Sequence, residues 1–262
     1  MGIAIGILHP GEMGAAVGAV AIQRGNTVFW LPEGRSPHTN ARADAAGLQR
    51  VRNLAELAEQ AAVIVSLCPP HAAIDVATIV AASGYEGIFL DANAVSPATA
   101  AAIGTIVADA GAKFVDGGVI GGPPAATGSS PTKLYLSGAR AAEVATVFGD
   151  LAVDLGPDPV AASALKMCYA SWTKGTAAQL IALRDVARHF GVDDALLAEW
   201  DRSQPGLRAR SNSAAASTAA KAWRFIGEME EVAATFSAAG EPSGFGLAAA
   251  EVYRGIQRQR AT

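Results

Sequence analysis

The first residues able to do chemistry come directly after the first apolar run of the chain. Residues 3–8 read Ile-Ala-Ile-Gly-Ile-Leu, and the next six read His-Pro-Gly-Glu-Met-Gly before an Ala- and Val-rich stretch begins. A strand that turns through glycines into a helix can bind an anion, because the first N–H groups of the helix and its dipole face the turn. The pattern therefore predicts a dinucleotide site whose turn is altered at its first position. The usual motif, G-x-G-x-x-G, has glycine where this chain has His9.

Each residue of this turn has an expected role. Gly11 allows a pyrophosphate to approach the backbone closely, and Gly14 allows the helix to pack tightly against the strand. Pro10 has no N–H to donate, and His9 requires a wider or differently shaped turn. A strand–turn–helix unit without a ligand is the alternative interpretation. The predicted cofactor-binding residues of the turn are His9, Pro10, Gly11, Glu12, Met13 and Gly14.

The residues after the second apolar run, Thr27–Leu31, bear on which dinucleotide binds. Glu33 could hold the ribose 2′-OH of NAD(H), whereas Arg35 beside Ser36 could hold the 2′-phosphate of NADP(H). Arg42 could add positive charge. We expect NADP(H) to be preferred and NAD(H) to be possible, with a solvated loop as the alternative.

Later apolar runs also end where ligands are expected to collect, at the carboxyl edge of a parallel sheet. Cys68 ends one run, and we interpret it as a small packing residue because no base is evident to activate it. Asp91-Ala92-Asn93 ends the next run. Residues 116–124 follow a further run and are rich in glycine. They are typical either of a loop whose N–H groups face a ligand or of a flexible loop.

Lys166 stands in an apolar helical stretch, between Leu165 and Met167. A lysine in such a helix is commonly a surface residue that extends its ammonium group into water. If it is buried at a cleft, desolvation lowers the pKa of the ammonium group and suits it to proton transfer. Both interpretations stay open from position alone.

The first half of the chain alternates apolar runs with helical stretches, which indicates βαβ units and a parallel sheet. The expected strands are Ile3–Leu8, Thr27–Leu31, Ala62–Cys68, Ile88–Asp91, Lys113–Asp116 and Lys133–Ser137. The expected helices are Gly14–Arg24, Pro37–Gly47, Asn53–Gln60, His71–Ala82 and Pro97–Ala110.

The pattern changes at Gly156-Pro157-Asp158-Pro159. From Val160 to Phe190 we expect one apolar helix of about 30 residues, about 45 Å long, buried between domains or subunits. The remainder predicts only helices, at Leu196–Trp200, at Ala214–Ala239 with a possible interruption, and from Leu247 onward. The predicted domains are a dinucleotide-binding α/β domain at 1–157 and an all-helical substrate and dimerisation domain at 158–262.

Composition excludes several classes of protein. Hydrophobic residues make up 51% and charged residues 17% of the 262 residues, which is typical of a globular chain rather than a disordered one. The net charge is −4 with no basic stripe, so we expect no nucleic-acid partner. The two cysteines show no metal-binding spacing, and we expect no metal. No apolar run suits a membrane span and no leader pattern precedes the first strand, so we expect a cytoplasmic protein with no membrane partner.

Taken together, these motifs resemble the β-hydroxyacid dehydrogenase family, which includes 6-phosphogluconate and 3-hydroxyisobutyrate dehydrogenases. The resemblance extends over nearly the whole chain. It is strongest with the branch that has a phosphogluconate dehydrogenase-like C-terminal domain of unknown function. The segments that match this branch are Leu8–Gly14, Asp91–Ala94, Leu165–Met167 and Trp223–Glu231.

The resemblance implies a Rossmann-type domain, a long inter-domain helix and an all-α C-terminal domain that forms a homodimer. It implies hydride transfer between NAD(P) and a hydroxy acid or related carbonyl compound, with Lys166 as the catalytic acid and base. It also implies that Gly121 and Gly122 bind the substrate. Leu67, Cys68 and Pro69 correspond to the family's loop along the nicotinamide ribose.

The chain departs from the family where the substrate binds. Asn93 replaces a hydroxyl residue of D-x-S-T, and Ile120 replaces the serine of D-A-P-V-S-G-G, which helps to hold a carboxylate. Tyr169 stands for the first asparagine of K-x-x-N-N and is a second candidate acid, and a later Lys-Asp pair reads Gly227-Glu228. We therefore expect a less acidic or larger small-molecule substrate. The predicted substrate-binding residues are Asn93, Ile120, Gly121, Gly122, Tyr169 and Glu228, and Asn93 is also predicted to contact the cofactor.

Two other functions stay open. An imine reductase would have the same fold, although relatives with that chemistry often carry Asp or Tyr at the position of Lys166. The loss of the carboxylate-binding serine at Ile120 favours this alternative. A non-catalytic NADP(H)-binding protein is the third possibility, and His9 in the fingerprint motivates it.

Overall fold

The computed structural model describes residues 2–128, 130–218 and 222–261. The chain divides into two compact units, Met1–Lys166 and Met167–Thr262. The predicted boundary at residue 157 falls just after the last strand. The units divide later, because the first half of the following helix is held against the sheet.

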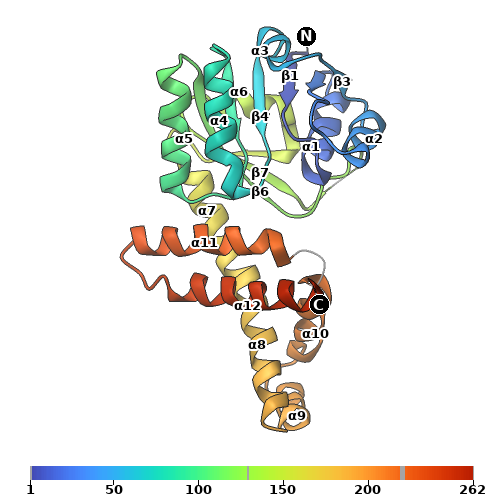
Figure 1. Ribbon diagram of the computed structural model, residues 1–262, viewed down its shortest axis with the longest axis vertical. Helices are drawn as coiled ribbons and strands as arrows, with labels where there is room; N and C mark the ends of the chain where they lie inside the picture. Colours follow the sequence, from blue (N-terminus) through green and yellow to red (C-terminus); the bar gives the residue numbers. More distant parts are fainter. Residues whose placement is uncertain (1, 129, 219–221, 262) are drawn as a thin grey trace. The chain divides into compact units, whose positions relative to one another are not determined.

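An eight-stranded sheet forms the centre of the first unit (Figure 1). Its order is β3-β2-β1-β4-β5-β6-β7-β8, and within it only the β6–β7 pair is antiparallel. β1 lies between β2 and β4, so the direction of winding reverses there, at the position where dinucleotides bind in this class of fold. The strands are β1 (Ala4–Ile7), β2 (Thr27–Trp30), β3 (Gln49–Arg50), β4 (Val63–Ser66), β5 (Ile88–Asp91), β6 (Lys113–Ile120), β7 (Lys133–Ser137) and β8 (Ala152–Asp154).

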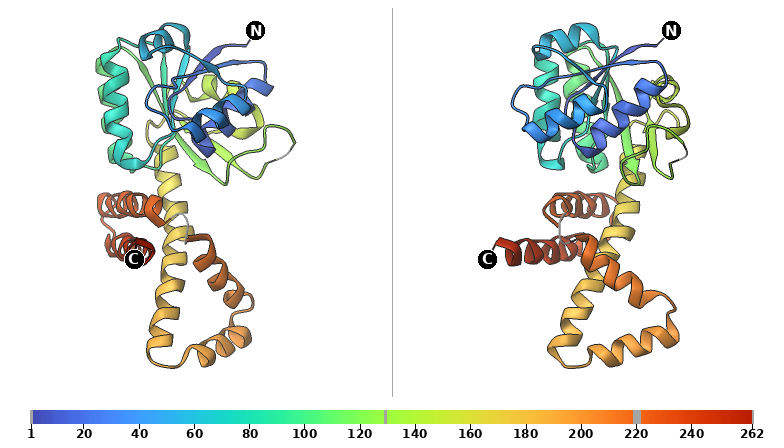
Figure 2. Two further views of the ribbon diagram at one scale, coloured as in Figure 1. Left: turned by 45° about the vertical axis from the view of Figure 1, so that its right-hand side comes forward. Right: turned by 90° about the vertical axis from the view of Figure 1, so that its right-hand side faces the viewer.

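Helices cover both faces of this sheet, as Figure 2 shows from two further directions. Every residue of β4 and β5 is buried, which is why each strand reads as an apolar run up to a final polar residue, Ser66 or Asp91. Side chains alternate between the two cores: Val63 and Val65 pack in one and Ile64 in the other. One face carries α1 (Glu12–Gln23), α2 (Pro37–Ala45) and α6 (Ala141–Phe148), and the other carries α3 (Leu54–Gln60), α4 (Ala73–Ala82) and α5 (Pro97–Asp109).

The predicted long helix is present as one continuous run with a change of pitch in its middle. It comprises α7 (Ala161–Ala170), a π-helical segment (Ser171–Gly175) and α8 (Thr176–His189). Short π-helical segments of this kind are rare and frequently lie at functional sites.

The described residues of the second unit form helices joined by short turns, with no strand among them. α8, α9 (Asp193–Ser203) and α10 (Leu207–Thr218) form the sides of a triangle (Figure 2), and α11 (Ala222–Ala238) and α12 (Gly244–Ala261) form a helical hairpin. The predicted helix Ala214–Ala239 includes residues 219–221, which lie outside the described residues. No helix in the described part of the chain is both long and apolar enough to cross a membrane.

The structure corrects the prediction for the glycines after Asp116. We expected a loop from Gly117, but β6 continues to Ile120 and pairs with β7. A Cβ on Gly117 would lie 3.0 Å from the carbonyl oxygen of Asp91, and one on Gly118 would lie 2.8 Å from that of Ala162. These glycines therefore serve close packing of the backbone inside the sheet and against α7.

We predict that Gly118→Ala destabilises the protein by about 1–3 kcal/mol, because the added Cβ forces β6 and α7 apart. Gly122→Ala is the matched control, since a Cβ there has no other atom within 4 Å. The free energies of unfolding, measured by urea titration, should differ accordingly. Equal stability of the two variants would contradict the close contact.

Candidate functional site

The turn between β1 and α1 has the shape that an anion site requires. The N–H of Gly11 donates to the His9 carbonyl oxygen at 2.8 Å, and α1 begins at Glu12 with no side-chain cap. A Cβ on Gly14 would lie 2.3 Å from the same carbonyl oxygen, so only glycine fits there. A Cβ on Gly11 would meet nothing within 4 Å. The N-terminus of α1 is therefore accessible to a phosphate group.

Four parallel strands bring predicted site residues to one edge of the sheet. His9 follows β1, Arg35 follows β2, Cys68 follows β4 and Asn93 follows β5. The strand pairings place the ends of β2, β1, β4 and β5 in sequence along that edge. The structure thus gathers these residues around the reversal point beside β1.

A tight turn after β2 separates the two residues predicted to choose the cofactor. The N–H of Arg35 donates to the Pro32 carbonyl oxygen at 3.1 Å, and Gly34 has a φ of 71° in this turn. Glu33 is exposed, whereas Arg35 is partly buried. The guanidinium group lies close enough to act electrostatically on both His9 and Cys68.

Burial, and secondarily the charge of Arg35, lowers the pKa of His9 to about 4. Burial also lowers the pKa of Arg35. Nδ1 of His9 and Nε of Arg35 are buried without a hydrogen-bond partner among the described residues. Buried polar atoms in this state cost free energy. An anionic nucleotide at this edge would supply acceptors, so these residues fit a dinucleotide.

Ser36 already has a structural use. Its Oγ accepts the N–H of Thr39 at 3.2 Å and so caps α2, whose first residue is Pro37. Its predicted contact with a phosphate stays a prediction.

Asn93 holds the ends of β4 and β5 together. Its Oδ1 accepts the N–H of Cys68 at 2.5 Å, and its Nδ2 donates to Ser66 Oγ at 3.0 Å and to Asp91 Oδ1. The side chain is 2% exposed. It therefore fixes the loop Leu67–Pro69, and its predicted contacts with cofactor and substrate stay predictions.

Cys68 has the environment of a packing residue. Burial raises the pKa of its thiol to about 11, so the thiol is protonated near neutral pH. The side chain packs against the core under α4 and α5. A nucleophilic role does not fit this state.

Asp116 joins β6 to the first turn of α7, a role that no sequence motif indicated. Its carboxylate accepts the Ser163 N–H at 2.7 Å, the Ser163 hydroxyl at 2.6 Å and the Ser137 hydroxyl at 3.2 Å. Ser137 Oγ in turn accepts the N–H of Ala162 at 2.9 Å. Burial raises the pKa of Asp116, and the hydrogen bonds partly oppose this.

Lys166 lies one helical turn after this anchor. Its Nζ donates to the carbonyl oxygen of Val119 at 2.8 Å, and its Cβ lies at the place where Gly118 leaves room. The ammonium group is therefore held over the end of β6, in the same unit as the dinucleotide turn.

The residues predicted to bind substrate fall in both units. In the first unit, Gly121 has a φ of 125° and follows Ile120, and the carbonyl oxygen of Gly122 accepts the Thr132 hydroxyl at 2.7 Å. In the second unit, Tyr169 is 46% exposed. Their contacts with a substrate stay predictions.

Glu228 is buried in the second unit and forms an ion pair that sequence analysis missed. Its Oε1 lies 2.7 Å from Nζ of Lys174, which belongs to the π-helical segment and also lies over the Phe225 ring. The Tyr253 hydroxyl donates to the Lys174 carbonyl oxygen at 2.6 Å, and burial raises the pKa of Tyr253. Lys174 and Glu228 lie 54 positions apart in sequence, with no motif to connect them.

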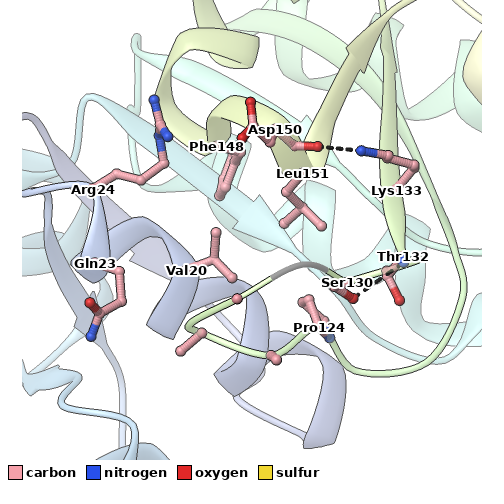
Figure 3. Close-up of a pocket in the computed structure, with 13 residues that line it drawn as sticks. Val20, Gln23, Arg24, Pro124, Ser130, Thr132, Lys133, Phe148, Asp150 and Leu151 are labelled. Carbon is pink, nitrogen blue, oxygen red and sulfur yellow. Dashed lines mark hydrogen bonds between the residues drawn. The ribbon is translucent and has the colours of Figure 1, made fainter.

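A surface cavity of about 360 Å³ lies elsewhere in the first unit (Figure 3). None of the predicted site residues lines it. Figure 3 shows Lys133 Nζ donating to the Asp150 carbonyl oxygen at its rim. Within the described part of the chain, no cluster of His, Cys, Asp and Glu could hold a metal ion.

Comparison with protein families gives two matches. The model of the NAD binding domain of 6-phosphogluconate dehydrogenase matches residues 4–152, and a domain of unknown function, DUF1932, matches residues 187–256. An uncharacterized 28.5 kDa protein from Methanothermus fervidus is 30% identical over 167 residues. That alignment spans 63% of this chain and 63% of the relative's own length.

Solved structures share the fold over nearly the whole chain. A conserved protein of unknown function, described as similar to 3-hydroxyacid dehydrogenases, aligns with a TM-score of 0.71 at 24% identity, covering 99% of this chain and 98% of that one. The 3-hydroxyisobutyrate dehydrogenase of Mycobacterium tuberculosis aligns with a TM-score of 0.70 at 20% identity (98% and 94% covered). An imine reductase of Streptomyces aurantiacus aligns with a TM-score of 0.58 at 20% identity (96% and 93% covered).

Proposed function

Because the chain belongs to the family defined by the NAD binding domain of 6-phosphogluconate dehydrogenase, we propose that it is an NADP(H)-dependent oxidoreductase. It transfers hydride between the nicotinamide and a hydroxy acid or related carbonyl compound. The observation that carries this proposal is the position of Lys166, held by Val119 and by the Asp116 anchor in the unit that contains the dinucleotide turn.

The turn from His9 to Gly14 and the loop with Arg35 would hold the dinucleotide, whose nicotinamide supplies or accepts the hydride when bound. Lys166 moves the proton. During carbonyl reduction its ammonium group donates a proton to the substrate oxygen, and during alcohol oxidation its neutral amine accepts the hydroxyl proton. Val119 keeps Nζ oriented through its carbonyl oxygen. Tyr169 is the second candidate donor.

Preference for NADP(H) is supported by the loop after β2. Arg35 turns toward the sheet edge with a buried Nε that has no partner among the described residues, while Glu33 faces solvent. An inward arginine suits a 2′-phosphate, and an inward carboxylate would have suited a free 2′-OH.

The substrate proposal rests on Ile120. An isoleucine cannot donate the hydroxyl hydrogen bond that a carboxylate-binding serine provides, so the substrate is less acidic or larger than those of typical relatives. The same substitution favours an imine reductase as the second candidate, and retention of Lys166 favours the first. Assays of hydroxy acids, aldehydes and cyclic imines with both cofactors distinguish the two. Cofactor binding without turnover of any of them would indicate a non-catalytic protein.

We predict that Lys166→Met lowers kcat by about 10²–10⁴-fold on the substrate found in this panel, with cofactor affinity retained, because only the proton donor is lost. Lys113→Met is the matched control, since Lys113 is exposed and its Nζ contacts only the Gly111 carbonyl oxygen among the hydrogen bonds described. Steady-state kinetics give kcat, and fluorescence titration gives the affinity. Full turnover by Lys166→Met would refute this role.

We predict that Arg35→Ala weakens NADPH binding by about tenfold or more and leaves NADH binding within about twofold, because it removes one charge-assisted contact to the 2′-phosphate. Arg52→Ala is the control, because the Arg52 side chain is 85% exposed and pairs with Glu56. Both dissociation constants come from isothermal calorimetry. Equal losses for the two cofactors would mean that Arg35 does not read the phosphate.

A homodimer formed through the second unit is also proposed. Three apolar side chains are exposed at helical spacing on α8 and at its C-terminal end. They are Leu183, Val186 and Phe190, and Phe190 is 71% exposed. Side chains three and four residues apart share one helix face. An apolar stripe of this kind marks an association surface.

We predict that Phe190→Glu yields a monomer, because a charge placed in the stripe must be desolvated on association. Ile79→Glu is the control: Ile79 is also exposed, but it lies in the first unit. Light scattering after size exclusion measures the mass. A wild-type protein that is monomeric at micromolar concentration would contradict the proposal.

A further inference from the structure

We propose that His9 and Arg35 form one recognition site for the 2′-phosphate of NADP(H), in which His9 takes up a proton when the phosphate binds. This inference rests on the proposed function and specifies how the cofactor is selected. It gives His9, which breaks the usual glycine fingerprint, a chemical role of its own.

The sheet register brings the two residues together. Ile7 of β1 pairs with Trp30 of β2, so the residues that follow the two strands leave the sheet side by side. His9 is the second residue after β1, and the Pro32–Arg35 turn directs Arg35 back toward it. The adenosine ribose lies between these two strand ends in dinucleotide-binding folds.

Both side chains have a nitrogen atom, unpartnered in the described part of the chain, that can donate to an anion, His9 Nδ1 once the ring is protonated. Nδ1 of His9 and Nε of Arg35 are each buried without a partner among the described residues. A phosphate group has oxygen acceptors in several directions, so one group can satisfy both donors. The hydrogen bonds of the Arg35–His9 pair are therefore satisfied only when an anion is bound.

The electrostatics of the free protein hold His9 in its neutral form. The charged groups on the surrounding elements are Glu12 in the first turn of α1, Glu33 and Arg35 after β2, and Asp91 at the end of β5. Among these, Arg35 lowers the pKa of His9 in addition to burial, and the Cys68 thiol is neutral. A phosphate dianion beside the ring acts in the opposite direction and favours the imidazolium form.

The sign of the pH dependence follows from this difference. In the free protein His9 is neutral at pH 7, because its pKa is about 4. In the NADPH complex its pKa is raised, so binding takes up a proton. NADPH affinity must then fall as the pH rises from 7 through the pKa of the complex, whereas NADH affinity, with no 2′-phosphate, stays level. The ratio of NADPH affinity to NADH affinity is therefore greatest near neutral pH and declines at alkaline pH.

Calorimetric titration of the full-length protein at pH 7.5, in two buffers of different ionisation enthalpy, counts the protons exchanged. At this pH the phosphate is mainly dianionic, since its second pKa is about 6. We expect wild-type protein to take up a proton with NADPH and none with NADH. His9→Asn should lose this uptake and bind NADPH about tenfold more weakly, which is the linkage effect expected if the pKa of His9 in the complex lies about one unit above this pH.

NMR of the histidine rings gives a second readout that needs no substitution at His9 itself. The chain has four histidines, so the variants His38→Gln, His71→Gln and His189→Gln assign the remaining ring signal to His9. Addition of NADPH to wild-type protein at pH 7.5 should shift that signal toward its protonated position, and NADH should not.

Three results would overturn the inference. They are proton uptake that persists in His9→Asn, equal weakening of NADPH and NADH binding in that variant, and a wild-type His9 ring that stays neutral in the NADPH complex. Each leaves the proposed function standing, because cofactor still binds and turnover can still be measured. Wild-type protein that binds neither dinucleotide would refute both.

Discussion

The buried carboxylate of Asp116 is the contact on which the candidate site depends. It accepts two hydrogen bonds from Ser163 at the beginning of α7, where the helix dipole favours a negative charge, and one from Ser137 at the end of β7. This attachment brings α7 against β6 so closely that Gly118 cannot carry a side chain, and it sets the height of Lys166 above the strand end. Loss of the carboxylate would leave one helix N–H group and two serine hydroxyls to find other partners.

The opposite end of the site is organised by strand ends rather than by a helix. β1, β2, β4 and β5 each deliver one polar residue to the same edge, and Asn93 ties two of these ends together through its amide. His9 and Arg35 are left with donors that no described residue satisfies. The edge is therefore rigid at Asn93 and chemically incomplete at His9. That combination suits a preformed binding site, because the framework is fixed before a ligand arrives.

Sequence patterns predicted much of the fold, because parallel strands that are buried on both faces read as apolar runs. The bounds predicted for β5 and for β7 are those observed. They missed β3 and β8, two short strands without such a run, and the helix α6. The need for glycine at 117 and 118 comes from neighbours far along the chain, and so do the anchoring role of Asp116 and the pairing of Lys174 with Glu228. Local pattern cannot reveal them. The turn at His9–Gly14 was recognisable, but the lowered pKa of His9 comes from its burial and, secondarily, from Arg35, which follows another strand.

The division between the two units falls inside α7, directly after Lys166. The proposed proton donor and the dinucleotide turn thus form one module, and Tyr169 and Glu228 belong to the other. Mutations in the second module can accumulate without disturbing the distance between the donor and the cofactor edge. A lineage with this arrangement can change residues of the second unit while the first unit keeps its own framework.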